Sequence, residues 1–261
     1  MRVSYDWLAL GAAACWAVTG LLSAPQARHL GAIAFTRWRM GLVLLMLLPV
    51  VVLNGGWQTL TLPSLGALAL SGLVGIFVGD SALFGCMNRL GPRRSSVLFA
   101  THAFFSVLLG FAVFDERIGL QAVLGGTLVV GGVMMAVAMG AHKNESHALE
   151  VVRGSWWMGV ALGLLAALCQ ALGSLIAKPV VAAGADPVAA TLVRVASTCA
   201  AHLVLLWSGA AVARAQAPVT RSVVLRVGAS GLVGMGLGMS LIMLALRHGD
   251  VGMVGILSLS L

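Results

Sequence analysis

The sequence predicts an all-α polytopic membrane protein built from two repeats of five transmembrane helices, the second of which is incomplete. Hydrophobic residues make up 60% of the 261-residue chain and charged residues only 9%, whereas roughly 25% of the residues of a soluble domain are charged. Apolar runs of about 20 residues, the length that spans a bilayer, recur along the whole chain. In addition, residues of the first half return in the second half in the same order, and many transporter folds are built in this way.

The apolar runs are predicted to be helices because they are continuously apolar and do not alternate with a period of two. Only helices and closed barrels satisfy their backbone polar groups in lipid. Charged residues, Gly and Pro mark the ends of the runs. The first half is therefore predicted to hold helices over residues 5–22, 33–53, 64–87, 95–114 and 118–139.

A polar segment, residues 140–155, separates the two halves and contains the run HKNESH at residues 142–147. It is predicted to be a connecting loop. The second half is predicted to hold helices over residues 156–177, 187–207, 222–246 and from Val251 onward. Residues 1–139 thus form the first repeat and residues 156–261 the second.

The repeat is clearest in the two third helices, where residues 71–75 (SGLVG) return as residues 230–234. Cys15 of the first helix aligns with Cys169, and Arg37 of the second helix aligns with Arg194. Both arginines are near the starts of their helices, so we expect their long side chains to snorkel to the lipid headgroups. The glycine-rich strings of the third helices have the small-xxx-small spacing that lets helices pack closely.

Carried to the end of the chain, the repeat places Ala103 opposite Leu261, so that nothing in the second half matches residues 104–139. A half-helix that ended in hydrocarbon would leave carbonyl groups unsatisfied, at several kcal/mol each. We therefore expect the complete protein to have ten helices, against about nine here, and about 35 further residues.

The composition and the motifs of the chain also argue against several classes of function. The net charge is +8, but the basic residues are scattered beside apolar runs, which argues against a nucleic-acid partner and favours contacts with anionic headgroups. The four isolated cysteines have no metal-ligand spacing, so we expect no metal and no cofactor. The glycine-rich strings follow no strand and are not nucleotide loops. No catalytic motif is present, and we do not expect an enzyme.

Asp80 is the first candidate for a functional residue because it lies in the middle of the third predicted helix. A carboxylate there costs roughly 2.5 to 3.5 kcal/mol on insertion scales and needs a partner, a proton or a wet cavity. Its repeat counterpart is Met239, so the symmetric scaffold does not require an acid at this position. We expect Asp80 to bind a proton or a cation, and the alternative is a protonated or hydrogen-bonded structural Asp.

Four further residues are candidates for binding substrate or protons. His102 and His202 lie inside predicted helices and could handle protons, although a packed and hydrogen-bonded histidine is an equally good interpretation. Trp16 and Gln170 are repeat counterparts that could stack on and hydrogen-bond a substrate near the centre of the fold. Simple packing is the alternative for Trp16.

Several motifs resemble the EamA family of the drug/metabolite transporter superfamily. They are residues 14–17 (ACWA), residues 91–100 (GPRRSSVLFA), residues 114–118 (FDERI) and the glycine pairs of the fifth predicted helix. The family often has a proline after the position of His102, where this chain has Ala103 and so lacks the residue that would kink the helix. The resemblance implies a ten-helix fold and a central cavity lined mainly by helices one to four and six to nine.

The resemblance also implies export of small polar metabolites, commonly amino acids, across the bacterial cytoplasmic membrane. We expect a secondary transporter that works by alternating access, with the bilayer, a small-molecule substrate and a second copy of the chain as partners. The alternatives are a non-transporting remnant or membrane subunit and an intramembrane enzyme acting on lipid-linked substrates.

The orientation of the chain is left open by two conflicting signals. Lys and Arg, Arg39 among them, are concentrated after the first, third, fifth and seventh predicted helices. The positive-inside rule then places the N-terminus outside, whereas the family resemblance implies that it is inside.

Overall fold

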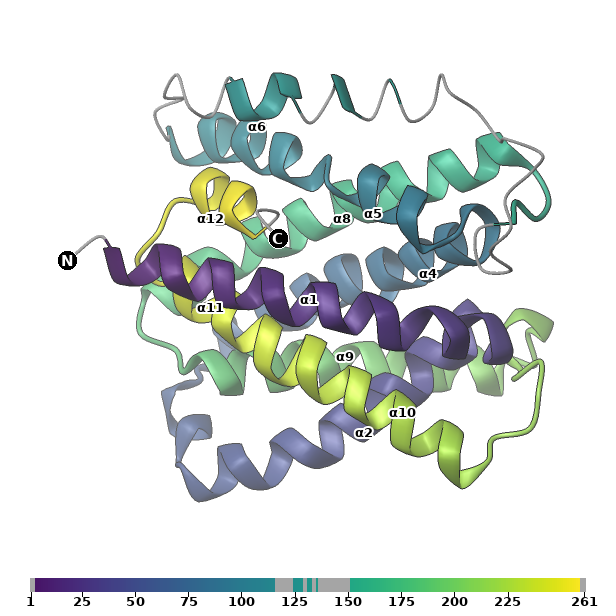
Figure 1. Ribbon diagram of the computed structural model, residues 1–261. Coiled ribbons are helices and arrows are strands. Elements are labelled where there is room, and N and C mark those ends of the chain that lie inside the picture. Colours follow the sequence, from purple (N-terminus) through teal and green to yellow (C-terminus); the bar gives the residue numbers. More distant parts are fainter. Residues whose placement is uncertain (1–2, 116–123, 129–130, 133–134, 136–150, 259–261) are drawn as a thin grey trace.

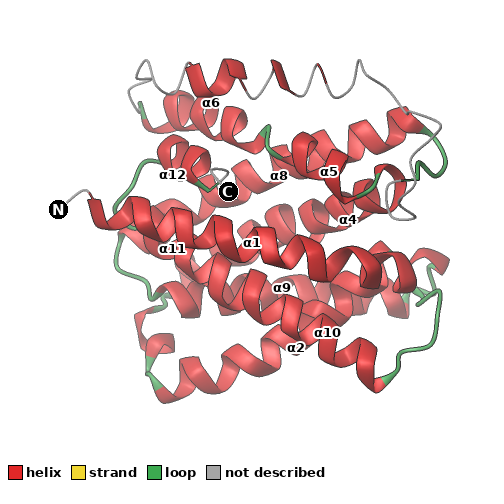
Figure 2. Cartoon of the chain, viewed as in Figure 1, coloured by secondary structure: helices red, strands yellow, loops and turns green. Residues whose placement is uncertain are grey.

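The computed structural model of the protein describes residues 3–115, 124–128, 131–132, 135 and 151–258. These residues form a bundle of packed helices (Figures 1 and 2), and no strand occurs among them. Seven helical segments of this part of the chain are long and apolar enough to cross a membrane. The predicted all-α polytopic class is therefore confirmed.

The first repeat begins with two long helices joined at Gly31, whose φ of 83° lies in the left-handed region that favours glycine. The first of them, α1, continues eight residues beyond the predicted end at Leu22 and includes Pro25. The elements of this repeat are α1 (Val3–Leu30), α2 (Ala32–Leu53), η1 (Gly56–Thr59), α3 (Leu62–Gly72), η2 (Leu73–Val78), α4 (Gly79–Leu90), α5 (Pro92–Phe99) and α6 (His102–Phe114).

Three helices of the second repeat begin with a side-chain N-cap. The side chains of Ser155, Asp186 and Thr220 each accept a hydrogen bond from a backbone N–H in the first turn of the next helix. The elements are α8 (Trp156–Ala182), α9 (Pro187–Trp207), η3 (Ala211–Ala213), α10 (Arg221–Gly231), η4 (Leu232–Met239), α11 (Ser240–Leu246) and α12 (Val251–Leu257). Most of the predicted fifth helix and of the polar segment 140–155 lies outside the described residues.

The third span of each repeat is one continuous rod with a π-helical centre. In the first repeat, η2 joins α3 to α4, and in the second, η4 joins α10 to α11. The two π segments start at Leu73 and Leu232, which are equivalent positions in the repeat. π-helical turns are rare and are found frequently at functional sites.

The fourth span of the first repeat is broken into α5 and α6 at Ala100 and Thr101, although no proline is present. The Thr101 hydroxyl donates to the Leu98 carbonyl oxygen at 2.7 Å, and the Ala103 N–H bonds to the Ala100 carbonyl oxygen at 3.2 Å. These three-residue contacts tighten the turn and replace the α-helical ladder there. The helix is therefore interrupted close to Ala103, the position at which the sequence lacks the proline.

The two repeats interlock, because the first helix of each packs on the third span of the other. In Figure 1, α1 runs beside α10 and α11, and in the same way α8 packs against α3, η2 and α4. The contacts are equivalent: a β-carbon on Gly238 would lie 3.2 Å from Cβ of Cys15, and one on Gly79 would lie 3.2 Å from Cβ of Cys169. The glycines of the third spans therefore act as packing positions, as the small-xxx-small spacing predicted.

The structure corrects the repeat alignment of the second helices. The hydroxyls of Thr36 and Thr191 each donate at 2.9 Å to a carbonyl oxygen at the first residue of their helices, Ala32 and Pro187. In this register Arg194 is equivalent to Arg39. The alignment with Arg37 was therefore wrong, because it matched residue types without knowing where each helix begins.

The snorkelling prediction is also wrong for Arg194, which is completely buried. Arg37 donates to the backbone carbonyl oxygen of Ala213 in η3. Arg39, counted above as a loop cation, is 3% exposed inside the bundle. Each of these three side chains contacts other protein groups. Their positive charges are therefore not evidence of contacts with lipid headgroups.

Candidate functional site

A cavity of about 430 Å³ lies inside the bundle, within the size range of small-molecule sites. Its walls come mostly from α1, α4 and α5 of the first repeat, and Gln170, Met235, Met239 and Ser258 of the second repeat complete them. Two charged side chains line it, Arg39 and Asp80. The cavity is otherwise mostly apolar, so these two charges dominate its electrostatics.

Arg39 and Asp80 form a buried ion pair, with Nη1 of Arg39 donating to Oδ2 of Asp80 at 3.1 Å. The Arg39 guanidinium also lies over the ring of Phe84, 5.4 Å from its centroid, as in a cation–π contact. Asp80 thus has the partner that a membrane carboxylate requires. Asp80 is among the residues predicted from the sequence, whereas Arg39 is not.

The equivalent place in the second repeat has the same cation without the acid. Nη1 of Arg194 donates to the sulfur of Met239 at 3.0 Å and lies 3.6 Å from that of Met243. These two methionines are the repeat counterparts of Asp80 and Phe84. Within the described residues, Nε and Nη2 of Arg194 have no hydrogen-bond partner. The only carboxylate of the two equivalent clusters therefore lies in the first repeat.

Aromatic side chains form one end of the cavity wall. Trp16 and Phe99 have ring centroids 6.5 Å apart, and each meets the ring of His102, at 6.2 and 5.0 Å respectively. The Trp16 indole N–H donates to the Gly234 carbonyl oxygen in η4 at 3.1 Å. This bond fixes the indole plane beside the cavity, so Trp16 is positioned to stack on a bound molecule.

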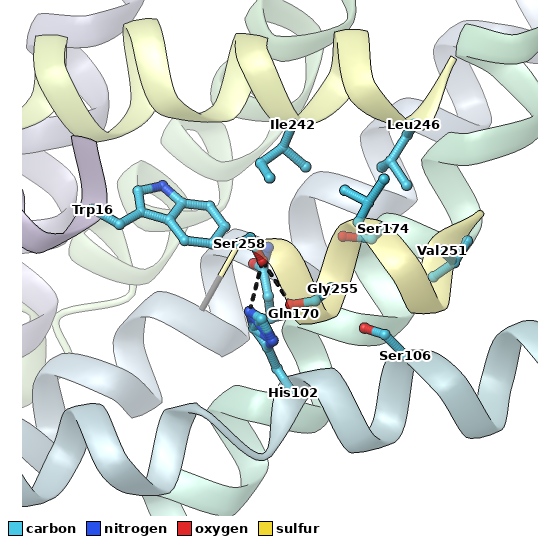
Figure 3. A pocket seen from close by; sticks show the side chains of 11 residues that line it. Trp16, His102, Ser106, Gln170, Ser174, Ile242, Leu246, Val251, Gly255 and Ser258 are labelled. Atoms are coloured by element: carbon cyan, nitrogen blue, oxygen red, sulfur yellow. Dashed lines mark hydrogen bonds between the residues drawn. The ribbon is translucent and has the colours of Figure 1, made fainter. Parts of the chain in front are cut away.

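A second, much smaller cavity of about 10 Å³ lies next to the first, with room for about one water molecule. Figure 3 shows His102 below Ser258, with Gln170 beside them and Trp16 and Ile242 above. The Nε2 atom of His102 lies 3.5 Å from the Ser258 hydroxyl oxygen. The Nδ1 atom of His102 has no hydrogen-bond partner within the described residues. Trp16, Gln170 and Ser258 line both cavities.

The structure thus brings four of the five sequence candidates together and leaves one apart. Asp80 lines the large cavity, His102 the small one, and Trp16 and Gln170 line both. His202 lines neither of these two cavities and is fully buried, with its ring 4.7 Å from that of Phe77. In the described part of the chain, no three His, Cys, Asp or Glu residues could hold a metal ion together.

Comparison with known proteins agrees with this architecture. The sequence model of the EamA-like transporter family matches residues 3–138, which is more than half of the chain. A search of curated proteins gives no match. One solved structure, described only as "Crystal structure of protein", superposes with a TM-score of 0.70 at 16% sequence identity, covering 100% of this chain and 85% of that one, and this shows a shared fold. The chain is therefore a multi-pass membrane protein that belongs to the EamA-like transporter family.

Proposed function

We propose that this transporter exports small polar metabolites, amino acids foremost, across the bacterial inner membrane by alternating access. The observation that carries the proposal is the Arg39–Asp80 pair in the wall of a cavity of about 430 Å³ that is otherwise mostly apolar. A cavity of this size accommodates a single small molecule. Membership of the family indicates a transporter. The ion pair is the reason for proposing amino acids as its substrates.

An amino acid carries one positive and one negative group, and so does the cavity wall. Its carboxylate can accept hydrogen bonds from Arg39 while its ammonium group donates to Asp80. The exchange replaces one ion pair by two, so no charge is left without a partner. A substrate with a single charge would leave Asp80 or Arg39 buried and unpaired, which is strongly unfavourable. The pair thus favours zwitterions over simple acids or amines.

The remaining wall favours an apolar side chain on the substrate. Trp16, Phe84 and Phe99 present aromatic surface, and Met235 and Met239 present flexible thioethers. Methionine packs against ligands of varied shape, whereas rigid aromatic rings give large contact areas. We therefore expect hydrophobic and aromatic amino acids to bind more tightly than small or acidic ones.

Asp80 also provides a means of coupling transport to an ion gradient. A proton or small cation that binds Asp80 would weaken its attraction to Arg39 and so change the energy of the cavity during the cycle. The chain has no nucleotide-binding motif, and a gradient-driven mechanism needs none.

The test is binding and counterflow of radiolabelled amino acids with the purified protein in proteoliposomes. We expect uptake of phenylalanine or leucine to exceed that of glutamate, and Asp80→Asn to abolish the dependence of uptake on an imposed pH gradient. Asp6→Asn is the matched control, because Asp6 is an exposed acid in the first turn of α1. A folded protein that neither binds nor transports any of the standard amino acids would overturn the proposal and favour the non-transporting remnant.

A further inference from the structure

The spans of the bundle alternate in direction, so each connection between them lies at one of two ends. At the end where α1 starts, the rings of Tyr5 and His248 stack 4.7 Å apart, which places the end of α11 there. At the other end, the Gln216 N–H donates to the Leu30 carbonyl oxygen at 3.1 Å, which joins the connection before α10 to the end of α1. In Figure 1 the first of these ends lies at the left, with the N-terminus, and the second at the right.

The end at which α1 stops carries most of the arginines, and we call it the basic end. There the Arg153 N–H donates to the Arg89 carbonyl oxygen at 2.8 Å, so the start of the second repeat meets the end of α4. The arginines of both repeats therefore lie on one surface, and all of them are exposed or partly exposed. The set is Arg28, Arg89, Arg93, Arg94, Arg153, Arg214, Arg221 and Arg226.

The opposite end, which we call the acidic end, holds every acid of the described structure except Asp80. The Asp186 N–H donates to the Thr59 hydroxyl oxygen at 2.8 Å, which joins the start of α9 to the connection before α3. The Lys178 ammonium lies over the ring of Phe114, 4.8 Å from its centroid, which joins the ends of α8 and α6. The acids are Asp6, Asp115, Asp186 and Asp250, and the described cations beside them are Lys178 and Arg247.

Both ends extend to the level of the lipid headgroups. Helix α1 has 28 residues, which gives a length of about 42 Å, against a hydrocarbon core of about 30 Å. Exposed tryptophans occur at both ends, Trp157 and Trp207 at the basic end and Trp7 and Trp57 at the acidic end. Tryptophan is enriched at both membrane interfaces. Aromatic anchors therefore do not distinguish the two ends, whereas charge does.

The scaffold shared by the two repeats does not require the arginines of the basic end. Equivalent positions lie at opposite ends, because α1 starts at the acidic end and α8 at the basic end. By the spacing that places Ala103 opposite Leu261, Arg93 corresponds to Val251. By the spacing that relates residues 71–75 to residues 230–234, Arg221 corresponds to Leu62. The arginines are thus a difference between the repeats, and orientation in the membrane explains it, because Lys and Arg near span ends favour the cytoplasmic side.

We propose that the basic end faces the cytoplasm, with its arginines against the phosphate groups of anionic lipids, and that the N-terminus faces the periplasm. Guanidinium groups bind phosphate oxygens in a bidentate manner, and the negative potential of the cytoplasmic leaflet attracts basic surfaces. This orientation is opposite to the one that the family resemblance implies. The proposal rests on the proposed location in the bacterial inner membrane but not on the proposed substrate.

The orientation is tested with single cysteines at Asn54 of the acidic end and Ala215 of the basic end, both exposed in connections between spans. The background has alanine in place of Cys15, Cys86, Cys169 and Cys199. A maleimide that cannot cross the inner membrane is added to cells with a permeabilised outer membrane. We expect it to modify Asn54→Cys at once and Ala215→Cys only after the inner membrane is disrupted. The reverse pattern, or equal modification of both cysteines before disruption, would overturn the proposal.

The lipid contact is tested by thermal unfolding of the purified protein in detergent with added phosphatidylglycerol or phosphatidylcholine. We expect the anionic lipid alone to raise the unfolding temperature, and the triple variant Arg214→Gln/Arg221→Gln/Arg226→Gln to lose much of that rise. Arg247→Gln is the control, because it removes a cation from the acidic end and should keep the rise. An equal effect of the two lipids, or an equal rise with inorganic phosphate, would refute the lipid contact.

Neither measurement needs a transported substrate, so the outcomes remain separate from those of the transport assay. Amino-acid transport by a protein whose Ala215→Cys is modified from outside would refute the orientation and leave the proposed substrate intact. Absence of transport by a protein with the expected cysteine pattern would refute only the proposed substrate.

Discussion

Arg39 and Arg194 occupy equivalent positions in the two repeats, yet within the described residues only Arg39 has a carboxylate within 4 Å. The neighbours of Arg39 are Asp80 and Phe84, and those of Arg194 are the equivalent Met239 and Met243. Both repeats therefore have a buried guanidinium group at this position, but in the described structure only the one in the first repeat pairs with an acid. This difference leads to the first two predictions.

Asp80→Asn should destabilise the protein, because it leaves the Arg39 guanidinium buried without a counter-charge. Breaking a buried ion pair in this way costs up to about 3–5 kcal/mol. Thermal unfolding in detergent measures the change. The double variant Arg39→Met/Asp80→Met removes both charges and should recover much of the loss. If the double variant is no more stable than Asp80→Asn, the ion pair does not explain the effect.

Met239→Asp should stabilise the protein, because it gives Arg194 the acid that Arg39 already has. The thioether of Met239 lies 3.0 Å from Nη1 of Arg194, so a shorter carboxylate at this position lies close enough to pair after a small adjustment. Met239→Asn has nearly the same shape without the charge and serves as control. We expect the Asp variant to unfold at a higher temperature than the Asn variant, and the reverse order would contradict the equivalence of the two clusters.

Gly72→Ala should destabilise the bundle, because its β-carbon would overlap the backbone of Arg194 in α9. Overpacking against backbone typically costs about 1–3 kcal/mol. Gly66→Ala in the same helix α3 is exposed and meets nothing within 4 Å, and should be neutral or stabilising by up to about 1 kcal/mol. Equal unfolding temperatures for the two variants would show that close approach of α3 and α9 is not required.

His202→Leu should keep both the fold and the transport activity. His202 is fully buried, both of its ring nitrogens are without partners in the described structure, and it lines neither cavity. Its repeat counterpart is Leu47, so the substitution makes the two second helices alike and removes unsatisfied polar atoms. Counterflow assays and thermal unfolding measure the outcome. A loss of transport with unchanged stability would return His202 to the group of site residues.

Much of the architecture could be predicted from the sequence because a membrane helix is recognisable as a run of about 20 apolar residues. The apolar runs predicted the spans, and the repeated SGLVG tract predicted that the third helices are equivalent. The long α1 was underestimated, because Ser23 and Pro25 resemble a helix end in isolation although tertiary packing continues the helix through them. The break at Ala100 and Thr101 was not predicted, because neither a proline nor a glycine marks it in the sequence.

The site was harder to predict than the fold, since it depends on which face of each helix points inward. Asp80 was selected on its charge alone, because a carboxylate is costly in any membrane helix. Arg39 was not selected, because an arginine eight residues into an apolar run can snorkel or be buried, and only the register of α2 decides between these outcomes. Ser258 and Phe99 are ordinary residues whose role depends on their place beside the cavities.

The π-helical segments η2 and η4 begin at equivalent residues, Leu73 and Leu232. A helix that contains a π-helical stretch cannot be drawn on a single α-helical wheel, because the 3.6-residue period does not hold inside the wider turns. The direction in which Asp80 points relative to Gly72 is therefore set by the π-helical turns between them, and an analysis of the third span by a regular helical period would assign these two residues to the wrong faces.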